Sequence, residues 1–334
     1  MKTKSQERMN KMKVNLAVCI ALAVSLLLCP AAALCAPKPQ PEPTVALPIA
    51  EEEAYISVMS STDGDIEKIK LREYVIGSVA AEMPAVYHTQ ALMAQAVASY
   101  TYAKKIGEQN KKYKESYLGE ADITDDPNIH QGYIDEQRRK EKWGDKFKEY
   151  EKKIEDAVDE VFGYFMSYNG ETALAVYHSV SAGKTQSAKT LWGSEIPYLT
   201  SVESPGDKLS PDFISTKTFS EKEFKKCAEN FDITLSGDPS EWVGELTKAD
   251  SGYVVSVRIG ATEVSASKFR EEFELKSCSF EIYYSDEEFT VTCKGHGHGA
   301  GMSQYGADYM ARQGSNWREI LQHYYSGISL DIDR

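Results

Sequence analysis

The apolar positions between Leu71 and Glu82 recur with the period of an α-helix. Each helical residue advances about 100° around the axis, so Leu71, Val75 and Glu82 fall on one face. Pro84 cannot continue the helix, and it disfavours helical geometry at the residue before it. The pattern therefore predicts a helix whose core-facing stripe ends in a carboxylate.

Two effects are expected to raise the pKa of the Glu82 carboxyl group. Burial removes water from the charged form, and the negative end of the helix dipole opposes a carboxylate in the last turn. No lysine or arginine stands close to Glu82 in the sequence. A general acid needs a pKa near ambient pH, so Glu82 is a candidate acid–base catalyst. The alternative is a glutamate that pairs with a distant cation and has no chemical role.

A second helix is predicted in "HTQALMAQAVASYTYAKKIG", with Thr89 as its N-cap. A short turn that contains Pro84 joins the two helices, so they should pack side by side with Glu82 near the corner. Gln95 and Tyr100 could face the same pocket as Glu82. Ordinary packing is the alternative for both residues.

Turn signals place the first strands of the fold. A strand pair is predicted around Asp63-Gly64, and "GYFMSYNGETALAVYH" is typical of two strands around an Asn169-Gly170 turn. The charged stretch 136–163 indicates a solvated helix with one apolar edge, and no chemistry is assigned to it. Strand and helix patterns from about 204 to 289 predict an inserted subdomain. The fold class expected is α+β, with mixed helices and small antiparallel sheets.

The first 36 residues differ in composition from the rest of the chain. An uncharged apolar run from Val14 to Ala36 follows basic residues, the pattern of an export signal, and it is long enough to span a bilayer. We favour a signal-anchor at 1–36 over a cleaved signal, with the rest of the chain outside the cytoplasm. The proline-rich stretch 37–53 indicates a semi-rigid linker, and a folded domain is expected at 54–332.

Charge and cysteine content narrow the remaining possibilities. The formal net charge of −13, without a dense Lys/Arg cluster, argues against a nucleic-acid partner. Outside the apolar run stand Cys227, Cys278 and Cys293. Cys278 and Cys293 flank a hairpin pattern and could form a disulfide, and buried reduced thiols are the alternative.

Two further stretches have the composition of functional loops. In "HSVSAGKT", His178, Ser179, Ser181 and Lys184 follow a strand, a common place for substrate contacts. In "GHGHGAGMSQYGADYMARQG", alternating glycines let the backbone approach a ligand closely, and a helix is expected from about Met302.

A weaker hypothesis is that the histidines bind a metal ion. His296 and His298 resemble a metal pair that lacks a third ligand. A second, weaker candidate for a cation is the set Asp122, Asp125, Asp126 and His130.

Three stretches, in order along the chain, resemble the stage II sporulation protein D family, also called SpoIID/LytB-domain proteins. They are "LREYVIGSVAAEMPAVYHTQALMAQAVASYTYA", "YHSVSAGKT…LWG…PYLTSV" and "GHGHGAGMSQYGA". The likeness covers about residues 54 to 330 and implies a SpoIID-type catalytic domain. Members are membrane-anchored or secreted wall proteins. The best known are lytic transglycosylases that cut peptidoglycan glycan strands and act beside a wall amidase during forespore engulfment.

The resemblance implies a role for Glu82 as the catalytic residue. A lytic transglycosylase uses one acid to protonate the glycosidic oxygen that leaves C1 of N-acetylmuramic acid. Its carboxylate then takes the proton from the C6 hydroxyl of the same sugar, and a 1,6-anhydro ring closes. The matched motifs show no obvious second acid, which favours this reaction over a two-carboxylate hydrolase. Substrate contacts are expected from Gln95, Tyr100, His178, Ser179, Lys184, His298, Ser303, Gln304 and Tyr305.

Two departures from the family pattern bear on function. Tyr100 stands where many members carry an arginine that supports activity, and "HQGY" replaces a cysteine-containing segment that binds zinc in some members. No metal or other cofactor is therefore expected. The expected partners are glycan strands, a cell-wall amidase and other engulfment-complex membrane proteins.

Two alternatives to the transglycosylase remain. One is a catalytically weak, wall-binding protein that recruits or enhances an N-acetylmuramoyl-L-alanine amidase, a reading that Tyr100 supports. The other is a metal-dependent wall hydrolase that uses His296, His298 and His178.

Overall fold

The computed structural model describes residues 54–113 and 115–333. The predicted signal-anchor at 1–36 and the predicted linker at 37–53 lie outside the described residues. Among the helices that are described, none combines the length and the apolar character that a membrane span requires.

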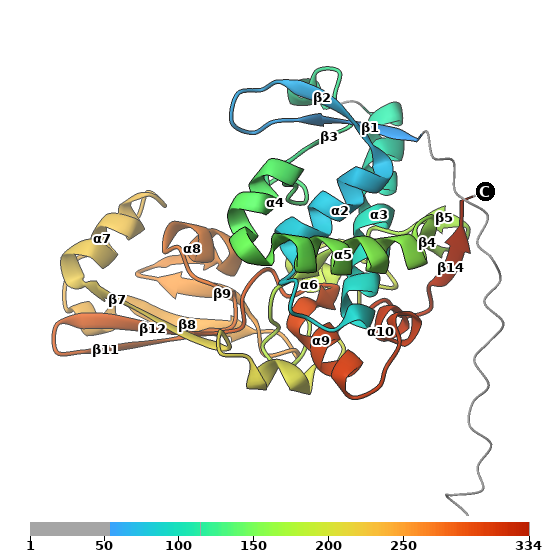
Figure 1. Ribbon diagram of the computed structural model, residues 1–334. Helices are drawn as coiled ribbons and strands as arrows, with labels where there is room; N and C mark the ends of the chain where they lie inside the picture. Colours follow the sequence, from blue (N-terminus) through green and yellow to red (C-terminus); the bar gives the residue numbers. More distant parts are fainter. Residues whose placement is uncertain (1–53, 114, 334) are drawn as a thin grey trace, which may run out of the picture. The chain divides into compact units, whose positions relative to one another are not determined.

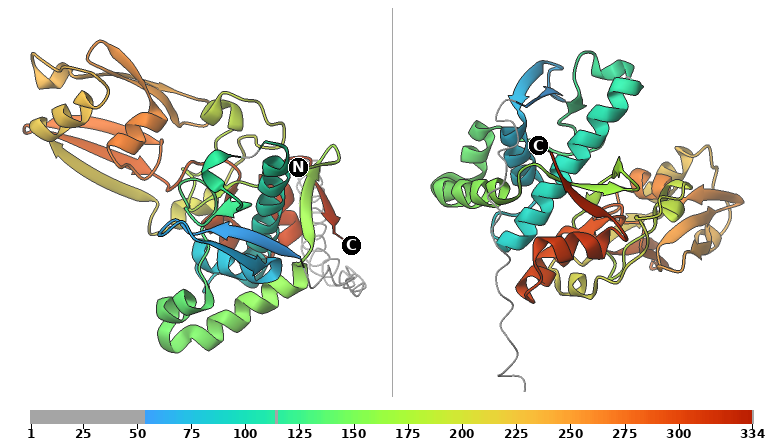
Figure 2. Two further views of the ribbon diagram at one scale, coloured as in Figure 1. Left: turned by 90° about the horizontal axis from the view of Figure 1, so that it is seen from above. Right: turned by 90° about the vertical axis from the view of Figure 1, so that its right-hand side faces the viewer.

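A long helix, α3 (Thr89–Lys112), runs through the larger of two hydrophobic cores. His88 rather than Thr89 is its N-cap, since the His88 ring accepts a hydrogen bond from Gln90 N at 3.2 Å. Figure 2 shows α3 with α5 on one side and with α9 and α10 near its N-terminal end. The other helices of eight or more residues in this core are α2 (Leu71–Glu82), α4 (Glu136–Trp143), α5 (Phe147–Val161), α9 (Gln304–Arg312) and α10 (Trp317–Tyr324).

Three small sheets complete this core, and Figure 1 labels the strands of the first two named below. Their orders are β2-β1-β3, β14-β4-β5 and β13-β6, and the last is a parallel pair. The turn at Asn169-Gly170 has φ angles of 52° and 80°, as a two-residue hairpin loop of type I′ requires, so this prediction is confirmed. The strands are β1 (Tyr55–Met59), β2 (Ile66–Lys70), β3 (Ile123–Thr124), β4 (Tyr164–Tyr168), β5 (Glu171–Thr172), β6 (Tyr177–His178), β13 (Met302–Ser303) and β14 (Ser329–Ile332).

A second core draws its buried side chains from Phe219 to Cys293. Two antiparallel sheets, β10-β9-β8 and β11-β12-β7, enclose a cluster of stacked phenylalanines. Its elements are β7 (Ile214–Ser220), α7 (Glu221–Glu229), β8 (Val243–Lys248), β9 (Val254–Ile259), β10 (Thr262–Ser265), α8 (Ala266–Glu272), β11 (Phe280–Ser285) and β12 (Glu288–Lys294).

The subdomain expected at about 204–289 overlaps this second core, whose buried side chains run from Phe219 to Cys293. The short helix η3 (Pro205–Leu209) packs against α9 of the first core. Cys278 and Cys293 are buried free thiols, so the disulfide considered for them is not formed. The mixture of helices and small sheets confirms the α+β fold class.

The charged stretch 136–163 is not the single solvated helix that the sequence predicts. It breaks at Gly144, which has a φ of 50°, into α4 and α5. Arg139 of α4 is only 1% exposed, and its guanidinium donates to Glu151, to Glu73 at 2.5 Å and to Ile134 O at 3.0 Å. These bonds join α4 to both α2 and α5. Charge pattern alone cannot distinguish such a buried cation from a solvated one.

Replacement of Arg139 tests whether this buried network holds α4 in place. Arg139→Met leaves Glu151, whose side chain is 13% exposed, without its partner, and we expect a loss of about 3 kcal/mol in the free energy of unfolding. Arg72→Met is the matched control, because the Arg72–Asp159 pair is exposed and is worth only about 0–1 kcal/mol. Urea unfolding of both variants gives the comparison. Equal losses would contradict the role assigned to Arg139.

Candidate active site

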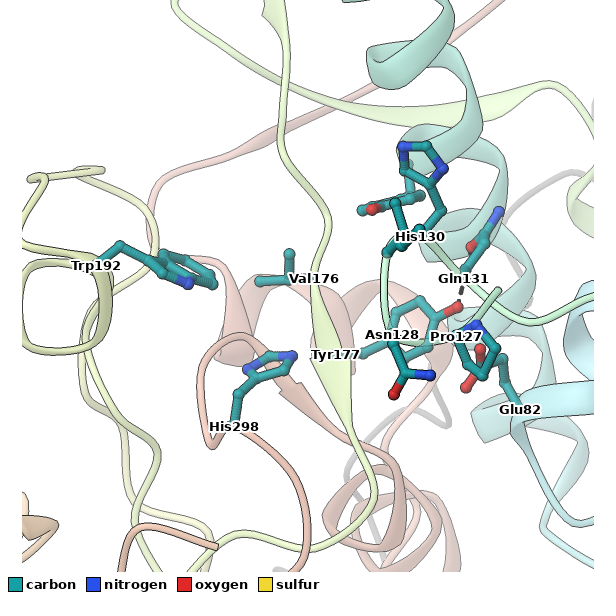
Figure 3. A pocket seen from close by; sticks show the side chains of 11 residues that line it. Glu82, Pro127, Asn128, His130, Gln131, Val176, Tyr177, Trp192 and His298 are labelled. Carbon is teal, nitrogen blue, oxygen red and sulfur yellow. Dashed lines mark hydrogen bonds between the residues drawn. The ribbon is translucent and has the colours of Figure 1, made fainter. Parts of the chain in front are cut away.

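Glu82 is the last residue of α2 and lines a cavity of about 340 Å³ (Figure 3). The helix ends because Met83 is extended, with φ −121° and ψ 137°, before Pro84. Val75 and Val79, on the same face as Glu82, are almost fully buried. Burial of this face is confirmed, but all residues 74–80 are buried, so the middle of α2 is enclosed on every side and not along one stripe alone. The Glu82 side chain is half-buried.

A backbone amide holds one oxygen of the Glu82 carboxyl group. Gly132 N donates to Glu82 Oε1 at 2.5 Å. A Cβ atom at position 132 would lie 3.0 Å from the same oxygen, so the loop approaches closely because the residue is glycine. Glu82 Oε2 is left without a hydrogen-bonded partner among the described residues.

Burial raises the pKa of the Glu82 carboxyl group, in the expected direction. The hydrogen bond from Gly132 and the positive charge of Lys142 act in the opposite sense and lower this pKa. Lys142 Nζ donates to Ala80 O at 2.8 Å, so it places a cation at the end of α2. The sequence indicated no cationic neighbour, because Lys142 comes from α4, far along the chain.

The loop between β3 and α4 forms one wall of the cavity. Gln131 lies in this loop, and its side chain is almost fully buried. Its amide donates to Tyr74 OH at 3.0 Å and to Ser99 O at 3.1 Å, and its Oε1 accepts from Tyr177 OH at 2.9 Å. These bonds fix the loop to α2, α3 and β6 and so hold Gly132 against Glu82.

The glycine-rich loop at 295–301 brings His298 to the cavity. Its four alternate glycines all have positive φ, and a Cβ atom on Gly301 would lie 1.9 Å from Val176 O. His298 Nδ1 accepts from Ala300 N at 3.1 Å. The alternation that the sequence shows therefore reflects a backbone that other residues could not adopt.

His178 lies beside His298, with ring centroids 5.6 Å apart. His178 Nδ1 donates to Ala300 O at 3.0 Å, and its Nε2 is buried without a hydrogen-bond partner. Burial lowers the pKa of His178 to about 3 and that of His298 to about 4. Both imidazoles are therefore neutral near pH 7.

The residues considered for metal binding do not fit a metal site. In the described part of the chain, no group of three or more His, Cys, Asp or Glu residues could hold a metal ion. His178 and His298 both use Nδ1 to bond the backbone of Ala300. In the candidate cation set, Asp122 accepts from Ser57 N and the His130 ring accepts from Thr124 N.

Of the predicted substrate residues, His298 lines the cavity with Glu82. Tyr100 is not among the residues that line the cavity. Its hydroxyl donates to Asp333 Oδ2 at 2.7 Å. Lys184 pairs with Glu203 at 3.4 Å. Roles in substrate binding for Tyr100 and Lys184 stay predictions.

The remaining predicted residues make internal contacts near the start of α9. Gln304 Nε2 donates to Gln95 Oε1 at 3.2 Å, and both side chains are buried. Tyr305 N donates to Ser179 O at 3.0 Å. The helix begins at Gln304 rather than Met302, and Tyr305 OH donates to Leu209 O. Substrate contacts for these four residues also stay predictions.

Ser303 caps α9 and is tied to a buried carboxylate that the sequence did not single out. Its hydroxyl accepts from Gly306 N and donates to Asp207 Oδ1 at 2.8 Å. Asp207 also accepts from the backbone and the hydroxyl of Ser181. The Asp207 carboxylate therefore links the loop that contains Ser181 to the start of α9. The role of Ser303 in substrate binding stays a prediction.

Sequence reasoning missed most of the cavity lining. Trp192 stood in the quoted "LWG" but received no role, and the 127–131 loop was considered only as a cation site. Helical and strand periods report which face of an element is buried, and they do not report which distant loop covers it. The lining residues without a predicted substrate role are Tyr102, Pro127, Asn128, Ile129, His130, Gln131, Val176, Tyr177 and Trp192.

Comparisons with known proteins agree with the motifs. A sequence model described as "Stage II sporulation protein" matches residues 60–168. Stage II sporulation protein D of Bacillus amyloliquefaciens is 36% identical over 283 residues, which cover 84% of this chain and 80% of that protein. The Bacillus subtilis (strain 168) protein of the same name is 37% identical over 276 residues, covering 82% and 78%. A protein named amidase enhancer, also from Bacillus subtilis, is 24% identical and covers 76% of this chain and 40% of its own length. The identities to the two sporulation proteins show that this chain belongs to the stage II sporulation protein D family.

Proposed function

We propose that the protein is a peptidoglycan lytic transglycosylase in which Glu82 is the single acid–base catalyst. The observation that carries the proposal is that Glu82 is the only carboxylate among the described residues that line the cavity. Hydrolysis by the usual glycosidase mechanism needs two carboxylates on either side of the scissile bond. One carboxyl group suffices when a hydroxyl of the substrate itself is the nucleophile.

The two oxygens of Glu82 have separate tasks in this reaction. Gly132 N–H holds Oε1 in both protonation states, so Oε2 carries the mobile proton. Oε2–H gives its proton to the glycosidic oxygen as the bond from this oxygen to C1 of N-acetylmuramic acid breaks. The carboxylate then accepts the proton of the C6 hydroxyl as O6 bonds to C1. The 1,6-anhydro ring closes, no water is consumed, and Glu82 is again protonated.

The environment of Glu82 suits both steps. Burial favours the neutral acid that begins the reaction. Gly132 and Lys142 stabilise the carboxylate that forms when the proton leaves. One residue with two roles requires both forms to be accessible, and these effects act on the two forms in opposite senses.

The biological setting proposed is cell-wall remodelling during sporulation, at the outer side of the cell membrane. The expected substrate is a glycan strand stripped of stem peptides, and the expected partners include a wall amidase. A role in enhancing an amidase is the second candidate, because a relative that matches most of this chain is named amidase enhancer. Tyr100 gives this alternative less support than the sequence suggested, since its side chain bonds Asp333 and does not line the cavity.

Glu82→Gln tests the proposed catalyst, because glutamine keeps the shape and removes the acid. We expect the rate of glycan cleavage to fall at least about 100-fold, the usual contribution of a general acid. Mass spectrometry of peptide-stripped peptidoglycan digests measures products that end in 1,6-anhydro-N-acetylmuramic acid. Glu195→Gln, at an exposed position, is the control and should keep full activity. Cleavage that survives in Glu82→Gln would refute the proposal, and glycan binding without cleavage by the unmodified protein would favour the amidase-enhancing alternative.

Lys142→Met tests the electrostatic part of the mechanism through the pH dependence of the rate. The reaction begins from protonated Glu82, so the rate falls as pH rises through the pKa of this group. Lys142 lowers that pKa, and its removal should raise it, so the descending limb of the pH–rate profile should move to higher pH.

Two controls accompany this measurement. Lys142→Arg keeps the charge and should keep the profile. Lys153→Met removes a lysine that donates to Ala85 O at 2.8 Å and is not among the charges that shift the pKa of Glu82, so its profile should also stay in place. A limb that does not move in Lys142→Met, or moves to lower pH, would show that Lys142 does not set the protonation of Glu82.

A further inference from the structure

Trp192 is exposed in a protein that buries its other large indole side chains. All four tryptophans lie among the described residues. Trp242 and Trp317 are 7% and 4% exposed and Trp143 is half-buried, whereas Trp192 is 45% exposed. Trp192 also lines the cavity of Glu82. An aromatic ring left in water at a candidate active site has the properties of a binding surface.

The indole ring is presented by a short, well-anchored helix, α6 (Ala188–Trp192). Ser187 caps the helix by accepting from Thr190 N at 3.2 Å, and Ala188 is fully buried. Just before it, Gln186 Nε2 donates to His298 O at 3.0 Å. The helix is thus tied to the loop that carries His298, so the ring is held in place before any ligand arrives.

His298 supports the indole ring from one side. The two ring centroids are 6.0 Å apart, with planes inclined by 45°. The ring of His298 is itself fixed by the hydrogen bond from Ala300 N. We name this pair, Trp192 with His298, the indole platform.

Trp192 and Glu82 lie on opposite sides of the cavity, with Val176 and Tyr177 between them (Figure 3). Among the described residues that line the cavity there is no lysine or arginine, and Glu82 is the only acidic one. Because His298 is uncharged near neutral pH, the indole platform offers an apolar surface without a positive charge. A negatively charged group on a ligand would find no oppositely charged partner there.

The two sugars of peptidoglycan differ in charge and in the groups that they carry. N-acetylglucosamine is uncharged, and one face of its pyranose ring presents C–H bonds that can stack on an indole. N-acetylmuramic acid bears a lactyl group, which carries either a stem peptide or a free carboxylate. In the proposed reaction Glu82 protonates the glycosidic oxygen on C1 of N-acetylmuramic acid. The neighbours of this sugar along an alternating strand are N-acetylglucosamine residues.

We propose that the indole platform binds the uncharged N-acetylglucosamine residue next to the muramic acid that is cleaved at Glu82. This inference rests on the proposed function, and it adds a subsite that sets the register of the alternating strand. With N-acetylglucosamine on Trp192, muramic acid is the sugar placed at Glu82. The charged lactyl group is thereby kept off the apolar platform.

Calorimetric titration of the full chain carrying Glu82→Gln with a β-1,4-linked N-acetylglucosamine tetramer tests the platform without turnover. Adding Trp192→Ala should weaken binding at least tenfold, equivalent to about 1.4 kcal/mol. Adding Trp192→Phe keeps a stacking ring and should cost less. Adding Tyr283→Ala removes an aromatic side chain of β11 that is 59% exposed and does not line the cavity, and should leave the affinity unchanged.

The indole N–H resonance of Trp192, followed by NMR, tests the choice of sugar. N-acetylglucosamine should shift this resonance, and N-acetylmuramic acid at the same concentration should shift it much less. The platform would be refuted by equal affinity in Trp192→Ala, by failure of the tetramer to bind, or by equal shifts from both sugars. Because Glu82 is already replaced, these outcomes do not depend on whether Glu82 is the acid.

Discussion

The hydrogen bond from Gly132 to Glu82 is the contact on which the rest of the site depends. A carboxyl group at the end of an apolar helical stripe is costly to ionise, and this single backbone donor limits the cost while leaving the other oxygen available. Much of the surrounding structure holds the donor in place. Gln131 fixes the loop from one side, and Arg139 bonds Ile134 O and so fixes it from the other.

The same organisation explains why a charged helix lies beside an apolar one. α4 contributes Arg139 to the first turn of α2 and Lys142 to its C-terminal end. One short helix therefore supplies both mechanical support for α2 and the positive charge near Glu82. A parallel pair of two-residue strands, β6 and β13, places the loop that follows β6 beside the start of α9, which follows β13. Asp207 joins this loop to the start of α9 through Ser181 and Ser303.

Local features of the fold were predictable because their causes are local. The end of α2 at Glu82 and the Asn169-Gly170 hairpin follow from residues within a few positions of one another. The raised pKa of Glu82 was predicted in direction, although the burial that causes it comes in part from distant segments. The placements of Gly132, Lys142 and Trp192 were not predictable, because each depends on packing between segments far apart in the sequence. The buried Arg139 was predicted to be solvated, since its partners Glu73 and Glu151 lie on two other helices. Gln95, Ser303 and Gln304 make internal contacts that the sequence did not indicate, and their expected contacts with substrate stay predictions.

The central claim is that one carboxyl group cleaves the glycan strand by using a hydroxyl of the substrate as nucleophile. Digestion of peptide-stripped glycan in water enriched in oxygen-18 tests this claim most directly, because the two classes of reaction differ in the source of the new C1–O bond. The single-residue mechanism predicts 1,6-anhydro ends that contain no oxygen-18. Reducing ends that carry one oxygen-18 atom at C1 would show that water is the nucleophile, and would contradict the single-residue mechanism assigned to Glu82.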